Sequence, residues 1–171
     1  IRGMTDSVRT ELMHEGSKIH ITMVQLSAFN TPQFEWARSH LPARPQPVPP
    51  IFQPEIAAKA IVWSASHRRR ELNVGFPAVK TILGNKLLPG FGDTMASKQA
   101  WAGQMDRSSP MPVERPDNLF ESVDGDYSSH GRFDKLSRTR SWHLLFTLRR
   151  ITNRFRLLRW RRVLRSAACA G

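Results

Sequence analysis

The first 32 residues constrain the fold more than any other stretch, because they read as a helix, a stop, a strand and a turn in close succession. Apolar residues at spacings of three and four predict one stripe of an α-helix with no capping residue before it: Ile1, Met4, Val8 and Leu12. Gly16 predicts the end of this helix, because glycine takes a left-handed backbone without strain. Apolar and β-branched residues then predict a short, mostly buried strand over residues 18–26.

This order of elements is typical of a βαβ-type crossover, so we expect an α/β fold. The following segments continue the pattern. Pro54 opens a helix that extends to about residue 66, with Ile56, Ala60 and Trp63 on one stripe. A brief strand over residues 71–74 ends at Gly75, and another helix runs from Pro77 to about residue 87.

Prolines and turns interrupt the remaining segments. Thr31 is placed to cap a short helix over residues 33–39, with Pro32 at its favoured first position. Residues 41–54 are rich in proline and are expected to run extended over the surface, not as a central strand. Residues 96–104 predict one or two helical turns, and residues 111–132 predict an irregular segment without a core of its own.

The net charge of +12 is concentrated at the C-terminal end of the chain. From Lys135 onward there are 11 basic and no acidic residues, whereas residues 1–134 carry 15 basic and 14 acidic residues. The first four-fifths of the chain is therefore electrostatically ordinary, and the basic character belongs to the tail.

Several classes of protein are excluded or disfavoured by composition. Cys169 is the only cysteine, so a disulfide scaffold is excluded, and the six histidines show no spacing typical of a metal site. The sequence shows neither a secretory signal nor a run of about 18 apolar residues, so we expect an intracellular, cytoplasmic protein. No Gly-x-Ser-x-Gly motif or Ser-His-Asp arrangement is visible.

The first twelve residues carry a resemblance to a known family. They are similar to the helix that follows the catalytic Tyr-x-x-x-Lys of short-chain dehydrogenases/reductases, typically Ala-hydrophobic-x-Gly-φ-x-x-x-Leu-Arg-x-Glu-Leu. The residues that fit this pattern are Gly3, Ser7, Arg9, Glu11 and Leu12. The later order of strand, Thr-Pro turn, short helix, Pro-rich loop, helix, strand and helix also resembles the C-terminal half of this family. The resemblance covers residues 1–88, extends weakly to 132 and omits the Arg-rich tail.

The resemblance implies part of a doubly wound Rossmann-type domain and an NAD(P)-dependent oxidoreductase. Such an enzyme acts on a small-molecule carbonyl or alcohol and often forms a homo-oligomer, with a tyrosine as acid/base, a lysine that lowers its pKa and a serine that positions the substrate. If the register is right, these three residues lie before Ile1. The sequence contains no G-x-G-x-x-G motif, and Tyr127 has no lysine four residues later. We therefore expect no catalytic residue in this chain, and no activity by the chain alone.

One cofactor contact remains as an implication of the resemblance. In the family a Pro-Gly-x-x-x-Thr turn contacts the nicotinamide carboxamide or the phosphates of NAD or NADP. The aligned residues 26–31 are Leu-Ser-Ala-Phe-Asn-Thr, so Thr31 is retained and Phe29 would offer its backbone, whereas Pro-Gly is replaced by Leu-Ser. The alternative is that Thr31 only caps the following helix.

Residues 1–100 are thus predicted as the C-terminal part of a Rossmann-like domain, 101–138 as a turn-rich, largely irregular extension and 139–171 as a basic tail. The tail, helical or disordered, combines arginines with two apolar stripes that lie almost opposite each other. It leaves three interpretations open: binding of nucleic acid through residues 141–166, contact with an anionic membrane surface through the same residues, or a disordered or non-selected extension. A non-catalytic basic interaction protein is therefore the alternative to the oxidoreductase.

Overall fold

The computed structural model describes residues 1–112, 115–125 and 127–149. The helices are α1 (Arg2–His14), α2 (Gln33–Trp36), α3 (Pro54–Ser66), α4 (Phe76–Leu87), α5 (Pro89–Met95), the π-helix η1 (Ala96–Ala100), α6 (Trp101–Gly103) and the 3-10 helix η2 (Asp134–Leu136). The strands are β1 (Met23–Leu26), β2 (Ala28–Phe29), β3 (Ala43–Pro45), β4 (Ile51–Phe52), β5 (Glu71–Val74), β6 (Met105–Pro110) and β7 (Ser137–Arg138). Residues 142–149 are also helical.

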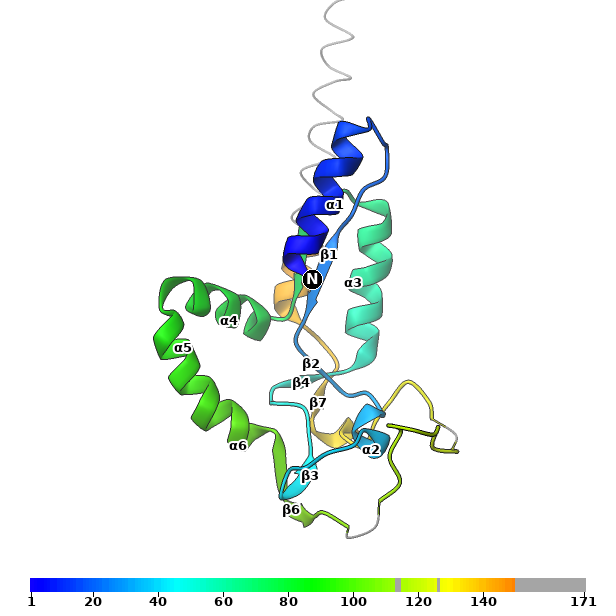
Figure 1. Cartoon of the computed structure of the whole chain (residues 1–171), viewed down its shortest axis with the longest axis vertical. Coiled ribbons are helices and arrows are strands. Elements are labelled where there is room, and N and C mark those ends of the chain that lie inside the picture. Colours follow the sequence, from blue (N-terminus) through cyan, green and yellow to red (C-terminus); the bar gives the residue numbers. More distant parts are fainter. Residues whose placement is uncertain (113–114, 126, 150–171) are drawn as a thin grey trace, which may run out of the picture.

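Two groups of parallel strands form the centre of the fold, with α1 and α3 on either side of β1 in the view of Figure 1. β1 pairs with β5, from Met23 opposite Glu71 to Leu26 opposite Val74. β4 lies between β2 and β7, and these three strands also run parallel. The predicted α/β class is therefore confirmed, and the arrangement is consistent with part of a Rossmann-like fold. β3 and β6 form a separate antiparallel pair.

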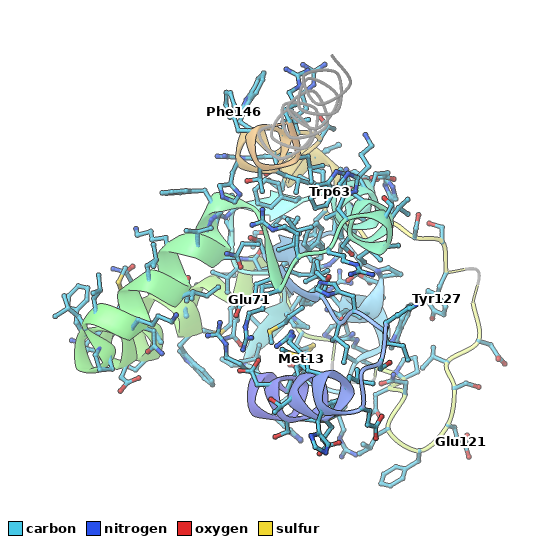
Figure 2. All side chains as sticks on the ribbon, turned by 90° about the horizontal axis from the view of Figure 1, so that it is seen from above. Met13, Trp63, Glu71, Glu121, Tyr127 and Phe146 are labelled. Atoms are coloured by element: carbon cyan, nitrogen blue, oxygen red, sulfur yellow. The ribbon has the colours of Figure 1, made fainter. Side chains whose placement is uncertain are left out.

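The hydrophobic core lies where α3 packs against the parallel strands. Its buried members come from α3, β4, β5 and the helical residues near the end of the described chain: Phe52, Ile56, Ala60, Leu72, Val74 and Leu144. Trp63 packs against the same cluster, so the stripe predicted for this helix is confirmed. Figure 2 shows Trp63 among side chains close to the centre, whereas Glu121 lies on a peripheral loop.

Glycines end two of the elements for a conformational reason. Gly16 has φ +66°, and the Gly16 and Ser17 amides donate to the carbonyls of Met13 and Leu12, which is the Schellman arrangement at the end of α1. Gly75 has φ +91° after β5, and a Cβ at this position would lie 2.6 Å from Ser27 Oγ. The strand end and the helix stop predicted at these two glycines are therefore confirmed.

The structure corrects the prediction for the proline-rich segment 41–54. This segment does not stay on the surface, because β4 is the middle strand of three and its residues Ile51 and Phe52 are only 1% and 4% exposed. The prolines at 49, 50 and 54 flank this strand and lie outside it. Both residues of β4 therefore keep their backbone N–H groups, so the flanking prolines do not prevent the strand from lying between two others.

Two further boundaries differ from the prediction. The strand expected from residue 18 begins at Met23, and none of its residues is fully buried. Before it, His20 and Thr22 contact the carbonyl of Arg69 through their side chains. The helix expected to reach residue 39 ends at Trp36, because Ala37 has an extended backbone (φ −63°, ψ 130°). The helical turns expected at 96–104 are confirmed in η1 and α6, which continue the arm that α4 and α5 begin (Figure 1).

The C-terminal third contributes more to the fold than its sequence pattern indicated. Strands β6 and β7 lie within or at the end of the extension predicted as largely irregular, and Leu144 of the predicted tail is buried in the core. The three interpretations of the basic tail rest mainly on residues 150–171, which lie outside the described residues. Among the residues that are described, no helix is both long and apolar enough to cross a membrane.

Candidate functional site

The candidate site is the turn that follows β2, at the carboxyl ends of parallel strands. β2 ends at Phe29 and the adjacent β4 ends at Phe52, with these two residues opposite each other in the register. Their rings lie 6.2 Å apart and anchor the two strand ends to the core. In open α/β sheets, ligands bind beyond the carboxyl ends of the strands, so this edge is where a cofactor contact is expected.

The two residues predicted to contact a cofactor lie in this turn. The Thr31 amide donates to the Phe29 carbonyl at 3.0 Å, which closes the turn. α2 begins at Gln33 with Pro32 at its cap position and has no side-chain cap bond, so the predicted capping role of Thr31 is wrong. Thr31 is half-buried, and within the described residues its hydroxyl has no hydrogen-bond partner. The hydroxyl therefore remains free for a ligand, and the cofactor contact stays a prediction.

Asn30, between these two residues, holds the turn from inside the protein. Its side chain is fully buried, and its amide nitrogen donates to Gln53 Oε1 at 3.1 Å and to Asp134 Oδ1 at 2.8 Å. Its side-chain oxygen accepts from the Phe133 amide at 3.0 Å, and its own amide donates to the Phe52 carbonyl at 2.9 Å. A buried polar group satisfied at every atom fixes its surroundings in one geometry, because each alternative leaves a group unpaired.

His130 adds a charged link beside this network. Nδ1 lies 3.1 Å from Asp134 Oδ1, and Nε2 lies 2.5 Å from Glu55 Oε1 at the start of α3. The hydrogen bond with Glu55, followed by that with Asp134, raises the pKa of His130 above its ordinary value of 6.5. The same bond with His130 lowers the pKa of Glu55, and a hydrogen bond from Gln53 is the main cause that lowers the pKa of Asp134.

Gly131 brings the backbone of this segment directly onto the turn. Its amide donates to the Asn30 carbonyl at 3.3 Å. A Cβ at Gly131 would lie 2.5 Å from the Thr31 carbonyl oxygen, closer than real Cβ contacts. Glycine is required here because of the close approach of two backbones.

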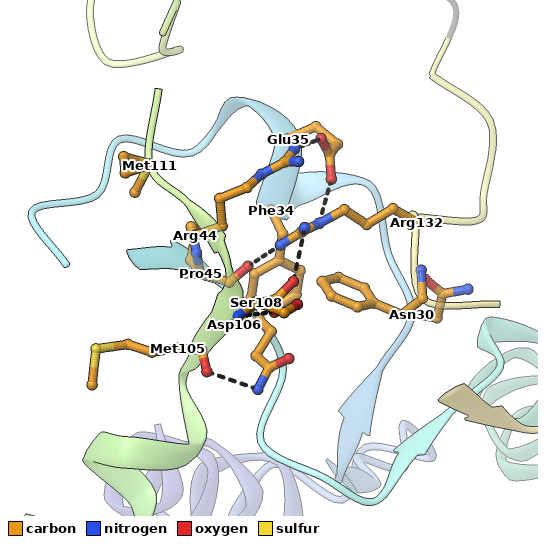
Figure 3. A network of polar contacts seen from close by, with 12 residues as sticks. Asn30, Phe34, Glu35, Arg44, Pro45, Met105, Asp106, Ser108, Met111 and Arg132 are labelled. Atoms are coloured by element: carbon orange, nitrogen blue, oxygen red, sulfur yellow. Dashed lines mark hydrogen bonds and ion pairs between the residues drawn. The ribbon is translucent and has the colours of Figure 1, made fainter. Parts of the chain in front are cut away.

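A second charged network lies next to the turn, around Arg132 (Figure 3). Its guanidinium pairs with Glu35 at 3.0 Å and Asp106 at 3.4 Å, donates to the Pro45 carbonyl at 2.8 Å and lies 4.7 Å from the centre of the Phe133 ring. Burial lowers the pKa of Arg132. These contacts join α2, β3 and β6 to the segment that precedes η2.

The sequence pattern did not identify the polar residues around the turn: Asn30, Gln53, Glu55, His130, Arg132 and Asp134. Asn30 follows directly after a predicted strand, which is a usable signal for a residue at the carboxyl edge of a sheet. The contact between Asn30 and Asp134 spans 104 residues, and no local periodicity reports such a pair. Tyr127 packs edge-on against Trp36, with ring centres 4.2 Å apart, in keeping with its predicted place in a loop.

The described residues contain no group of three or more His, Cys, Asp or Glu side chains that could hold a metal ion. Whether a redox cofactor suits this site depends on the hydrogen-bonding groups that the turn offers. The Thr31 hydroxyl can donate and accept, and the Phe29 carbonyl can accept, so the chemistry of these two groups suits a carboxamide. The sequence has no G-x-G-x-x-G turn, so the phosphates find no cradle of that type in this chain.

Comparison with known proteins relates the chain to an oxidoreductase. The "Uncharacterized oxidoreductase YxnA" of Bacillus subtilis (strain 168) is 28% identical over 159 residues, which are 90% of this chain and 43% of that protein. The chain therefore spans less than half the length of the relative that it matches. No family model matches the chain, and no solved structure matches it.

Proposed function

We propose that this chain is the C-terminal half of a short-chain dehydrogenase/reductase, which transfers hydride between NAD or NADP and a small-molecule carbonyl or alcohol. The observation that carries the proposal is the turn after β2. It lies at the carboxyl ends of parallel strands and presents the unpartnered hydroxyl of Thr31, at the position that the family resemblance assigns to the cofactor. The oxidoreductase relative supports the same class of reaction.

In this proposal the residues of the chain bind and orient, and the bound nicotinamide supplies the hydride chemistry. The Thr31 hydroxyl, which can both donate and accept, hydrogen-bonds the carboxamide. The Phe29 carbonyl accepts from the Thr31 amide and keeps a second lone pair for the ligand. Asn30 holds both groups in place through its buried network.

Proton transfer requires groups that this sequence does not contain. The only tyrosine is Tyr127, at the loop contact with Trp36, and no Tyr-x-x-x-Lys motif is present. We therefore assign the acid/base step and the phosphate-binding turn to another part of a longer protein. The length of YxnA relative to the matched segment supports this division.

The coding DNA upstream of the Ile1 codon provides the most direct test. We expect an in-frame Tyr-x-x-x-Lys shortly before Ile1, preceded by a strand and a Gly-rich turn. A stop codon or an unrelated reading frame at that place would overturn the proposal for this gene product.

Cofactor titration of the chain tests the division of roles. With NADH and NADPH, monitored by tryptophan fluorescence, we expect no saturable binding below about 1 mM, because a single carboxamide contact contributes little affinity. Saturable micromolar binding by the chain alone would contradict the division. In that case Thr31→Val should abolish the binding, and Thr147→Val, a change at a hydroxyl that donates to the His143 carbonyl away from the turn, should leave it intact.

A further inference from the structure

A short segment far along the chain lies across the turn after β2, and we name it the strap (residues 130–134). Its backbone touches the turn at two places, through the Gly131 amide on the Asn30 carbonyl and the Phe133 amide on the Asn30 side chain. Its two ends carry the side chains that attach it elsewhere. His130 reaches Glu55 on α3, and Asp134 reaches Gln53 after β4.

We propose that the strap holds the cofactor turn in its binding geometry and holds it less tightly when His130 loses its proton. The inference rests on the proposed function for the identity of the ligand. The mechanical part, a strap that orders residues 29–31 according to pH, rests only on the contacts in the structure.

The arrangement around His130 explains why a proton matters. Both ring nitrogens face carboxylates, and an imidazolium donates to both at once. A neutral imidazole has only one N–H, so one carboxylate would then face a lone pair. The hydrogen bond on that side, either to Glu55 on α3 or to Asp134 within the strap, would give way to repulsion between the lone pair and the carboxylate, while the other hydrogen bond would remain.

The two carboxylates are the charged groups that favour the protonated form of His130. Glu55 on α3 and Asp134 on η2 raise its pKa, while Lys59 lies close enough to Glu55 to lower the pKa of that carboxyl. Neighbouring Arg132 is paired with Glu35 and Asp106 and belongs to the second network.

The pH window follows from the directions of these shifts. The pKa of His130 is raised, so its contribution is complete below 6.5 and is lost as pH rises through the higher folded-state pKa. The pKa values of Glu55 and Asp134 are lowered, so their contribution is complete above 4.5 and is lost as pH falls through the lower folded-state values. The strap is therefore held most tightly between these limits and is loosened on both sides of them, on the alkaline side by loss of the His130 proton.

Hydrogen exchange on the full chain tests the inference without any cofactor. Amide protection of residues 28–31 and 130–134, corrected for the intrinsic pH dependence of exchange, should fall about five-fold as pH rises from about 6 to 9. His130→Gln should show the low protection at both pH values. His40→Gln, at an exposed histidine outside the strap and the turn, should behave like wild type. Protection that does not change with pH, or that His130→Gln leaves intact, would overturn the proposal.

A second measurement remains informative if His130→Gln fails to fold. In wild type, the NMR titration of His130 should lie above 6.5, and Glu55→Gln should move it towards the ordinary value. An ordinary titration of His130 in wild type would refute the charged link.

A glycine pair tests the backbone contact separately. Gly131→Ala should unfasten the strap at every pH, because the added methyl meets the Thr31 carbonyl, whereas Gly3→Ala meets nothing within 4 Å and should have no such effect. Equal protection in the two variants would show that the strap does not press on the turn. These outcomes do not depend on NADH or NADPH binding, so failure of the strap and failure of the proposed function are distinguishable.

Discussion

α1 and α3 are both 13 residues long and lie on either side of β1 in the view of Figure 1, yet they are attached to the fold by different forces. α3 buries Ile56 and Ala60 in the hydrophobic core. α1 buries no residue, and Ile1 and Met4 on its apolar stripe are 99% and 72% exposed. The same kind of sequence pattern therefore produced one packed helix and one whose apolar stripe is exposed at Ile1 and Met4 and only partly buried at Val8 and Leu12.

Polar contacts hold α1 in place. Three contacts leave the helix: Arg2 pairs with Glu71, Asp6 pairs with Arg70 at 2.5 Å, and Arg9 donates to the Ile21 carbonyl. Within the helix, Asp6 also pairs with Arg9 at 2.6 Å. Exposed ion pairs contribute little stability, and salt screens them. The comparison teaches that an apolar stripe predicts a helix reliably, whereas its burial depends on which other surfaces are present.

The largest expected difference between the two helices concerns their apolar residues. Ile56→Ala in α3 should cost about 2–5 kcal/mol of unfolding free energy, because it leaves a cavity in the core. Met4→Ala in α1 should change stability by no more than about 0.5 kcal/mol, because that side chain is in water. Urea unfolding measures both. Similar costs for the two variants would mean that the α1 stripe is covered.

Asn30 is expected to give an intermediate effect. Asn30→Ala leaves the Phe133 backbone amide and the side-chain oxygen Oε1 of Gln53 without this partner. The loss should cost about 1–3 kcal/mol of unfolding free energy. The control is Asn118→Ala, at an exposed position where the backbone amide, which the substitution keeps, donates to the Trp36 carbonyl. A loss below that of the control in urea unfolding would show that the network does not hold the turn.

The smallest effect is expected for the ion pairs of α1. Asp6→Asn removes the pairing with Arg9 and Arg70 and should cost at most about 1 kcal/mol at low ionic strength. In about 1 M salt the difference from wild type should vanish, because the Debye length is then only about 3 Å. Glu11→Gln, at an exposed acid on the same helix, serves as the control. A salt-independent loss in urea midpoints would indicate that α1 is held by burial instead.

Local chemistry determined the elements that the sequence predicted well. Gly16 and Gly75 end their elements because only glycine adopts those φ angles without strain, and Pro54 begins α3 where its missing N–H costs nothing. The alternation over residues 71–74 and the stripe of α3 mark burial because neighbouring residues along the chain share one surface. The resemblance to short-chain dehydrogenases/reductases, and not local chemistry, singled out Phe29 and Thr31 in the turn after β2.

Tertiary structure decided what lies against these elements. β4 is central because β2 and β7 arrive on its two sides, although β7 begins more than 80 residues later along the chain. Within the described residues the Thr31 hydroxyl is left without a hydrogen-bond partner, because α2 starts one residue too late for Thr31 to act as a cap. The strap meets Asn30 across a separation of about a hundred residues, through a close approach that only Gly131 permits. Periodicity in a sequence indicates which face a segment will bury, but packing over the whole chain decides what lies against that face. The turn was therefore predictable, and the network that holds it was not.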